Sequence, residues 1–442
     1  MMPASGHPLA DDARAIFAAA VDAVRSRPLV ANAVRFADDA LVIGDRSIAL
    51  AADSRVVVVG GGKAGRGMVR GLLDRLAPIA ERVTGLVSVP GDCVPDRWDG
   101  PVAIRAGRPA GDNSPHPEGV DGTRRMLQLV AEAGPEDVVV VLLSGGGSAL
   151  LTAPHGCTLD QKRTLTRQLA DAGATIAQLN AVRRQLSDVK AGGLLRSRGP
   201  GPVAVLAISD VIGDDWGTIA SGPTTPAADP AAAAASAVAV LDTLAVDCPD
   251  DLRTTIATPR RPIILSDAVS HHLIGSNAVA VAAAARVARD LGYEVVRAES
   301  GRAGEANAIG RELIGELQSL RRRGRPVAVI DGGEPVVSFA TAPGRGGRNQ
   351  QLVLAAIAAT GDWDGLALLS GGTDGEDGPT DAAGAVADAA IATSARERDI
   401  ARAVRDSDAY PLLHEVGGLL RTGPTDTNVM DVRVGLVGSP RP

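Results

Sequence analysis

The chain has 442 residues, of which 45 are basic and 52 acidic, giving a net charge of −7. Its apolar fraction of 45% and charged fraction of 22% are close to globular averages, which excludes wholesale disorder and collagen-like repetition. This acidic balance and the 8 aromatic residues (3 Trp, 2 Tyr, 3 Phe) disfavour a nucleic-acid groove built on basic stripes and stacking platforms. The length predicts two domains of ordinary size.

Cysteine spacing and the N-terminal pattern predict a soluble, cytoplasmic protein. Cys93, Cys157 and Cys248 lie far apart and form neither a disulfide framework nor a zinc ligand set. The first residues are acidic and lack the basic-then-apolar pattern of a signal peptide. The uncharged stretch 138–159 is long enough for a membrane span, but SGGGS and Pro154 interrupt it, which favours a strand, a loop and a helix. We therefore expect no membrane attachment.

Lysine is rare in this chain. Of the 45 basic residues only Lys63, Lys162 and Lys190 are lysines, so the other 42 are arginines. Where arginine serves as the ordinary surface cation, a remaining lysine is a candidate for a site that needs a compact ammonium group. Lys63 lies in a glycine loop and is such a candidate. Lys162 lies in the polar run DQKRT and is expected to be an incidental surface lysine.

Five apolar runs share one pattern, a buried strand followed abruptly by a loop of Gly, Ser or Asp. Continuous Val, Ile and Leu indicate strands covered on both faces, and hence parallel sheets flanked by helices. Helix-like stretches such as 67–76 and 276–293 lie between the runs, so the fold class is α/β. The five runs are 55–65, 137–150, 202–215, 326–335 and 365–378.

A change in composition marks the predicted domain boundary. Residues 222–262 contain an alanine-rich helix between prolines, followed by TPRRP. We therefore predict a Rossmann-like N-terminal domain with a parallel sheet flanked by helices over 1–225. A helical, proline-rich linker follows over 226–262, and a C-terminal α/β domain occupies 263–442.

Two glycine-rich loops follow predicted strands, GGGKAG at 60–65 and SGGGS at 144–148. At the carboxyl ends of parallel strands, backbone N–H groups of such loops and the next helix N-terminus form anion sites. Neither loop is a Walker A motif. Nor is GGGKAGRG a dinucleotide fingerprint, because the first acidic residue after the next strand, Asp92, comes too late. For each loop alone, a tight turn with close helix packing is the alternative.

Carboxylates gather beyond two further strands. ISDVIGDD places Asp210 at a strand end, with Asp214 and Asp215 shortly after it. These oxygens suit Mg²⁺ or a base that accepts a hydroxyl proton, and turn capping is the alternative. The loop 371–384 is the second candidate for such a role, and a wide solvated loop is the alternative. It contains Asp374, Asp377 and Asp381.

Two arginines lie between glycines in GRGGRNQQ, residues 344–351. The segment follows a strand and opens an apparent helix, so the guanidinium forks of Arg345 and Arg348 can approach a ligand closely. Such a fork is suited to a carboxylate or a phosphate. An exposed basic turn is the alternative, and we favour the clamp.

The motifs GGGKAG, SGGGSALL, ISDVIGDDWGTIASGPT, GGEPVVSFATAPGRGGRNQQ and LLSGGTDGEDGPTDAAGA occur in this order. Together they resemble the glycerate 2-kinase family, whose C-terminal part is the MOFRL domain, over about residues 12–437. The resemblance implies a two-domain α/β enzyme that phosphorylates the 2-hydroxyl of D-glycerate with ATP and a divalent metal such as Mg²⁺. It implies that Lys63, Asp210 and Arg348 are catalytic.

These segments and two further family-like motifs, LNAVRRQLSDVKAGGLL and GSNAVAVAAA, supply the residues that we predict to bind substrate or nucleotide. Asp210 and Asp214 are the predicted metal ligands. Which loop takes the nucleotide is open, and so is the choice between base and metal ligand for Asp210. The sequence departs from the family pattern at 107–119, Gln351 and Asp426, which belong to candidate substrate loops, so the exact acid substrate is left open. The binding residues are Gly61, Gly62, Ser144, Gly145, Gly146, Gly147, Ser148, Lys190, Asn277, Glu334, Asn349, Gln350 and Asp374.

Two functions compete with the kinase. A nicotinamide-dependent hydroxypyruvate reductase needs an acidic residue about 20 positions after the first glycine loop, and that interval ends in or just past a helix here. A non-catalytic sugar-phosphate-binding protein would use SGGGS to hold an anion without turnover. As a kinase, the protein is expected to bring MgATP and a small hydroxy acid together in a cleft between its domains, and a homodimer is one candidate assembly.

Overall fold

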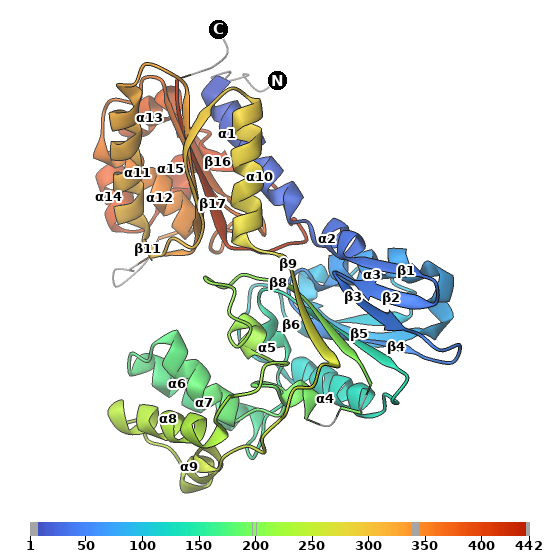
Figure 1. The fold of residues 1–442 in the computed structure, drawn as a ribbon. Coiled ribbons are helices and arrows are strands. Elements are labelled where there is room, and N and C mark those ends of the chain that lie inside the picture. The colour runs from blue at the N-terminus through green and yellow to red at the C-terminus, as the bar shows by residue number, and fades with distance from the viewer. Residues whose placement is uncertain (1–7, 197, 200, 338–343, 439–442) are drawn as a thin grey trace. The chain divides into compact units, whose positions relative to one another are not determined.

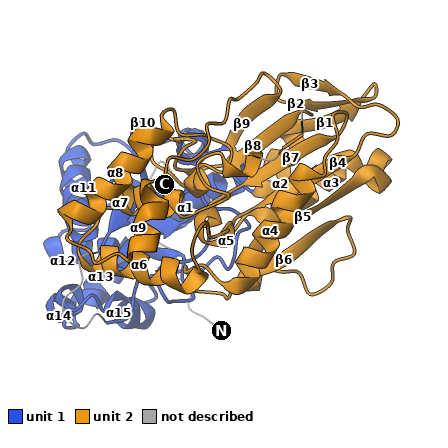
Figure 2. Cartoon of the chain, turned by 90° about the horizontal axis from the view of Figure 1, so that it is seen from below, with its two compact units in different colours: residues 1–25, 275–442 blue, residues 26–274 orange. Residues whose placement is uncertain are grey.

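The structure is a computed structural model that describes residues 8–196, 198–199, 201–337 and 344–438. It divides into two compact units, unit 2 with residues 26–274 and unit 1 with residues 1–25 and 275–442 (Figure 2). The division differs from the ranges expected from composition. The first 25 residues group with the C-terminal half, and the expected linker lies inside unit 2.

Unit 2 is built on a doubly wound sheet (Figure 1). Its order is β6-β5-β4-β7-β8-β9, and all the pairs from β6 to β8 are parallel. The chain starts at β4, builds outward to β6, and then returns to the other side of β4 with β7, so the topological switch point lies between β4 and β7. The strands are β4 (Val56–Gly61), β5 (Val83–Pro90), β6 (Val102–Arg108), β7 (Val138–Leu143), β8 (Val203–Ile208) and β9 (Val269–Gly275).

Helices cover both faces of this sheet, which confirms the Rossmann-like expectation. On one face Met126 and Val130 of α4 pack with Val57 and Val139 of the strands. Glycines on the other face let α2 and α3 approach closely, since a Cβ at Gly71 would lie 2.3 Å from the carbonyl oxygen of Arg27. The helices are α2 (Ser26–Ala33), α3 (Gly65–Leu76), α4 (Pro117–Ala131) and α5 (Gly147–Leu150), with 3-10 turns at Ala77–Arg82, Gly91–Cys93, Gly193–Leu195 and Ile219–Ser221. A small antiparallel sheet contains β1 (Val34–Ala37), β2 (Ala40–Ile43) and β3 (Arg46–Ala49).

The expected linker folds as half of a four-helix group. Its alanine-rich helix begins after Asp229, which accepts hydrogen bonds from two backbone N–H groups, and has Pro230 at its first position. Ala237 and Leu241 on its inner face join the apolar core with Leu165 of the first helix of the group. Capping boxes start the first two helices. The four are α6 (Leu159–Asp171), α7 (Ile176–Gln185), α8 (Pro230–Thr243) and α9 (Asp250–Ala257).

Lys162 on α6 is buried, contrary to the expectation of an incidental surface lysine. Only 2% of it is exposed, and its Nζ donates a hydrogen bond to the carbonyl oxygen of Leu186 at 2.6 Å. Burial lowers the pKa of Lys162 to about 7. The expectation rested on the polar neighbours of Lys162 in the sequence. In the helix, however, Lys162 lies on the buried face together with Leu165 and Leu169.

The buried lysine predicts a pH effect on stability. Between about pH 7 and 10.5 the unfolded chain still binds a proton that folded Lys162 has lost, so the free energy of unfolding rises with pH. Lys162→Met should therefore be most stabilising, relative to the wild type, below pH 7, and the difference should shrink towards pH 10.5. Denaturant unfolding at about pH 6 and about pH 9.5 measures this. Arg167→Met, which removes an exposed cation from the same helix, is the control; a pH-independent difference would contradict the expectation.

Unit 1 contains a mixed sheet of order β10-β12-β17-β14-β15-β16. β10 pairs with β12 in parallel, whereas β17 is antiparallel to both β12 and β14. The two predicted runs, β12 and β14, therefore point in the same direction as expected, but the sheet is mixed and not all-parallel because β17 lies between them. A continuous apolar run indicates that a strand is buried on both faces, but not in which direction its neighbour runs. The last strand of the chain, β17, is buried in this way and runs antiparallel to its neighbours. The strands are β10 (Glu294–Glu299), β12 (Val327–Gly333), β14 (Leu366–Gly372), β15 (Gly384–Asp388), β16 (Leu419–Leu420) and β17 (Asp431–Val437), with β11 (Gly304–Glu305) pairing β13 (Pro335–Val336).

Helices also cover both faces of this second sheet. α1 and α10 lie together on one face and α11 and α12 on the other (Figure 1). α1 thus belongs to unit 1 because its apolar side covers this sheet. The helices are α1 (Pro8–Ala23), α10 (Asn277–Asp290), α11 (Ala306–Arg321), α12 (Arg348–Ala359), α13 (Ala389–Arg396), α14 (Ile400–Arg405) and α15 (Ala409–Glu415). None of the helices described in either unit has the length and apolar character that a bilayer span requires.

Candidate active site

The two glycine loops meet at the switch point of the unit 2 sheet. The N–H of Lys63 donates to the carbonyl oxygen of Gly145 at 2.8 Å, and the N–H of Ala64 donates to Ser144 Oγ at 3.1 Å. A Cβ at Gly62 would lie 2.0 Å from Ser144 Oγ, so only glycine permits this approach. The structure therefore joins both predicted loops in one place, outside the carboxyl ends of β4 and β7.

Two cations lie beside the second loop. Gly146 has φ +77°, and a Cβ there would lie 3.5 Å from Lys63 Cγ and 3.7 Å from Arg108 Nη2. Arg108 ends β6, is 3% exposed, and donates to the carbonyl oxygen of Asp112 at 2.5 Å. The sequence analysis missed Arg108 as a site residue, although it lies in the atypical segment 107–119. Its place at the end of a predicted strand, at the sheet edge where the glycine loops lie, could have indicated that Arg108 belongs to the site.

Lys190 contacts the same loop through its ammonium group. Its Nζ donates to the carbonyl oxygen and to Oγ of Ser148, both at 2.8 Å, and Ser148 Oγ lies 2.8 Å from Ser221 Oγ. Lys190 is 1% exposed, and burial lowers its pKa, helped by the charge of Arg183. The contacts are those of a residue that positions Ser148. Ser221, which the sequence analysis did not single out, completes this group.

Backbone strain concentrates beside Ser148. Ala191, Ala220, Ser221 and Gly222 have φ of 48°, 50°, 64° and 65°, all in the left-handed region. The N–H of Ala191 donates to the carbonyl oxygen of Ser221 at 3.2 Å, which ties the two strained segments together. Left-handed backbone costs a non-glycine residue about 1 kcal/mol or more, and such strain tends to collect at functional sites.

The acidic loop after β8 is only partly accounted for by turn capping. Asp215 does cap a turn, since its Oδ2 accepts from Thr218 Oγ1 at 2.6 Å and its carbonyl oxygen accepts from the N–H of Ile219 at 3.0 Å. Asp210 and Asp214 are half-exposed, and Asp214 has φ 53°. Because β8 lies next to β7, Asp210 follows a strand end on the edge that carries the glycine loops.

In unit 1, Arg348 is held by two carboxylates. Its Nε and Nη2 donate to Asp431 at 2.7 and 3.0 Å, and its Nη1 donates to Glu334 at 2.8 Å. Asp431 is almost fully buried, whereas about a third of the Arg348 side chain is exposed. Burial lowers the pKa of Arg348, but the charges of Asp431 and Glu334 more than offset this and raise it. Arg348 is a fixed cation with one exposed side.

Asp374 belongs to the same group. A Cβ at Gly372 would lie 3.0 Å from Asp374 Oδ1 and 3.5 Å from Asp431 Oδ1, so both carboxylates border this glycine. Asn277 Nδ2 donates to the carbonyl oxygens of Val429 and Asp431 at 2.8 and 3.0 Å. Asn277 is 2% exposed, so its contacts position the strand start that carries Asp431.

Asn349 and Gln350 face the protein interior. Both have 0% exposure, and their N–H groups donate to Asp377 Oδ1 and Oδ2 at 3.0 and 2.8 Å. Burial raises the pKa of Asp377 to about 7, although these N–H groups lower it. Ser370 Oγ donates to Asn349 Oδ1 at 2.5 Å. These contacts fasten the start of α12 to the aspartate-rich loop, which is a positioning role for residues predicted to bind ligand.

Comparisons with known proteins agree with this architecture. The domain of unknown function DUF4147 matches residues 12–257, and the MOFRL family matches residues 327–431. The glycerate 2-kinase of Pyrococcus horikoshii is 34% identical over 426 residues, 93% of each chain. A solved glycerate kinase from Thermotoga maritima superimposes with a TM-score of 0.83 and 32% identity, covering 98% of this chain and all of that one. The chain belongs to the glycerate kinase family.

The resemblance found in the motifs is thereby confirmed. Within this glycerate kinase family, a protein of Agrobacterium vitis with the provisional name hydroxypyruvate reductase is 36% identical over 397 residues, 87% of each chain. The first matched segment, residues 12–257, spans α1 and most of unit 2, with both glycine loops. The second, residues 327–431, runs from β12 to the first residue of β17 and contains Arg348 and Asp431.

Proposed function

We propose that this protein is an ATP-dependent kinase that phosphorylates the 2-hydroxyl of D-glycerate or a closely related small hydroxy acid. The observation that carries the proposal is Lys63, a lysine among interlocked glycine loops at the switch point of a Rossmann-ordered sheet. Phosphoryl transfer needs such preorganised positive charge and backbone N–H groups more than it needs covalent chemistry. The Pyrococcus horikoshii relative at 34% identity is named a glycerate 2-kinase, and the solved structure from Thermotoga maritima is named a glycerate kinase.

In this proposal, backbone N–H groups and cations bind the anionic groups, and a carboxylate acts on the substrate hydroxyl or the metal. The N–H groups of the loop at 144–148 hold anionic oxygens, and Lys63 and Arg108 neutralise charge beside Gly146. The N–H groups expected to do the same at 60–62 are engaged within the protein, since Gly60 and Gly61 lie in the sheet and the N–H of Gly62 donates to the carbonyl oxygen of Ser88 at 3.1 Å. Arg348, fixed by Asp431, supplies a second cation for the transferring group. Asp210 accepts the proton of the 2-hydroxyl or holds the metal, and both roles need its carboxylate. We expect the enzyme to act in the cytoplasm, where ATP is available.

Magnesium would be held by Asp210 and Asp214. A Mg²⁺ ion that serves phosphoryl transfer takes one or two carboxylates and completes its shell with phosphate oxygens and water. Asp210 and Asp214 fit this pattern, because they supply two partly exposed carboxylates in the loop that follows β8. When bound, the ion would supply positive charge to the phosphates.

The reductase is the second candidate, suggested by the provisional name of the Agrobacterium vitis relative. A dinucleotide site would place an acidic side chain at the end of the second strand, where it meets the ribose hydroxyl groups. β5 ends in Ser88, Val89 and Pro90, and none of these can play that part. The geometry therefore favours the kinase.

The test is an ADP-release assay across glycerate, tartronate, threonate and erythronate. We expect ADP formation that depends on D-glycerate, and phosphorus NMR should identify 2-phosphoglycerate as the product. A parallel arm follows nicotinamide absorbance with hydroxypyruvate. If hydroxypyruvate is turned over in that arm and no ADP is formed from any of the acids, the protein is a reductase and the kinase proposal is wrong.

A further inference from the structure

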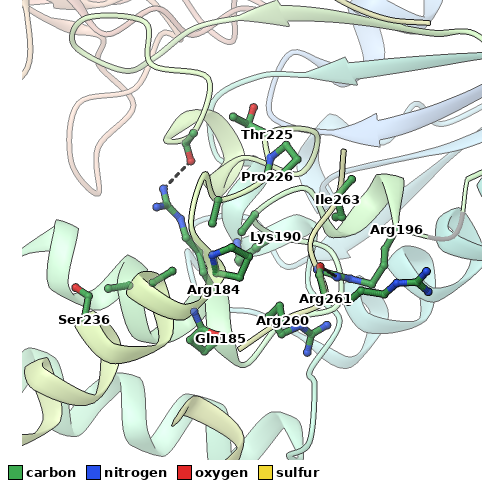
Figure 3. Close-up of a pocket in the computed structure, with 16 residues that line it drawn as sticks. Arg184, Gln185, Lys190, Arg196, Thr225, Pro226, Ser236, Arg260, Arg261 and Ile263 are labelled. Atoms are coloured by element: carbon green, nitrogen blue, oxygen red, sulfur yellow. Dashed lines mark hydrogen bonds between the residues drawn. The ribbon is translucent and has the colours of Figure 1, made fainter. Parts of the chain in front are cut away.

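Unit 2 contains a second basic site that the proposed function does not use. A cavity of about 230 Å³ lies between the end of α7, the segment after it, the start of α8 and the TPRRP segment (Figure 3). Its lining includes five cationic side chains, Arg184, Lys190, Arg196, Arg260 and Arg261, together with Gln185. The expected linker thus contributes two walls of a cavity.

The cavity carries an excess of positive charge. The described residues that line it include no Asp or Glu. Asp188, just outside, accepts from Arg260 Nη2 at 2.8 Å and also faces His155 Nδ1 at 2.9 Å, so it is shared. Burial lowers the pKa of Arg184, a sign that its charge is poorly compensated where it lies. Cations crowded in this way favour an anion as the missing partner.

Hydrogen-bonding groups at the cavity are also left unsatisfied. Within the described part of the chain, Arg184 Nε, Arg196 Nε, Arg260 Nη1 and Gln185 Oε1 are buried without a hydrogen-bond partner. Gln185 itself is 4% exposed, and a flip of its amide would offer two N–H groups in place of the oxygen. Buried polar groups of this kind usually have partners, so a ligand would satisfy several at once.

We propose that this cavity binds a small phosphorylated anion. Arginine forks match the oxygens of a phosphate group in geometry and charge. A cavity of about 230 Å³ has room for a phosphate or a three-carbon phosphorylated acid. The site is separate in its residues from the pair Lys63 and Arg348, and its occupancy does not depend on the proposed catalysis.

The site is connected to the second glycine loop. Lys190 lines the cavity and donates to Ser148 of that loop, and Arg184 Nη2 donates to the carbonyl oxygen of Gly217 at 2.6 Å. Gly217 in turn accommodates the left-handed turn at Gly222, since a Cβ at Gly222 would lie 2.8 Å from the Gly217 oxygen. An anion that draws on Lys190 and Arg184 therefore acts on the residues that position Ser148.

Thermal unfolding with inorganic phosphate tests the proposal without relying on activity. Phosphate should raise the melting temperature of the wild type by several degrees relative to potassium chloride of equal ionic strength. The increase should disappear in the rim variant, Arg196→Gln/Arg261→Gln, which replaces the partly exposed Arg196 and the exposed Arg261 of the cavity lining. It should persist in Lys63→Ala and in Arg253→Gln, which replaces a partly exposed arginine of α9 that pairs with Asp242 outside the cavity.

A second arm compares 2-phosphoglycerate with phosphate in Lys63→Ala, with and without the two rim substitutions, because the product of the proposed kinase would also bind at the glycine loops of the wild type. A larger shift than with phosphate at equal concentration identifies the phosphorylated acid as the ligand, and equal shifts identify free phosphate. Either result supports the site if the rim variant abolishes the shift. In the phosphate arm, a shift that survives in the rim variant but vanishes in Lys63→Ala would locate binding at the glycine loops and overturn the proposal. No shift beyond chloride in the wild type would overturn it as well.

Discussion

Replacing Lys63 by alanine is expected to lower kcat by about two to three powers of ten, as the loss of a preorganised charge donor does. The fold should survive, because the contact that joins the two loops is made by the backbone N–H of Lys63, which donates to Gly145, and alanine retains it. Steady-state kinetics and a melting curve, measured on the same preparation, separate the two effects. The melting temperature should change by only a few degrees.

Lys63→Arg should recover little of the lost activity. The stem of Lys63 passes close to Gly146, where Arg108 already places a guanidinium, so a second planar fork has no room and adds like-charge repulsion. Arg70→Ala is the matched control, since it removes a cation of α3 that lies over the ring of Trp98 and should leave kcat near the wild-type value. Near-normal turnover in Lys63→Arg would show that a compact ammonium is not required.

The sequence predicted the glycine loops and their neighbours well, for a physical reason. A run of buried Val, Ile or Leu that stops at glycine has few structural solutions, and a parallel sheet brings those stops to one edge. The scarcity of lysine pointed in the same direction. All three lysines are wholly or partly buried, and Lys63 and Lys190 both contact the SGGGS loop.

What the sequence could not predict depends on tertiary partners. Asn349 and Gln350 have the polar character of ligand-binding residues, but Asp377, far along the chain, takes their N–H groups. Arg108 has no local pattern that marks it, and only the order of β6, β5 and β4 gives it its importance. The alanine-rich segment resembles a linker in composition because small side chains suit close helix packing and solvent exposure equally.

Arg348→Ala is expected to abolish nearly all activity and also to reduce stability. Removing this arginine leaves Asp431, which is 1% exposed, as a buried charge without its bidentate partner, and such a loss costs about 3 to 5 kcal/mol. A large fall in kcat alone would therefore not show that Arg348 acts in catalysis, since the start of β17 would be disturbed as well.

The double variant Arg348→Ala/Asp431→Asn separates the two effects. It removes both charges, so most of the lost melting temperature should return, while kcat should stay about a thousandfold below the wild type, because the cation for the transferring group is still missing. Arg348→Lys keeps a charge but cannot form the bidentate contact with Asp431, and it should be intermediate in stability and close to the double variant in kcat. Activity that returns together with stability in the double variant would make Arg348 a structural residue, and the second cation of the mechanism would have to come from elsewhere.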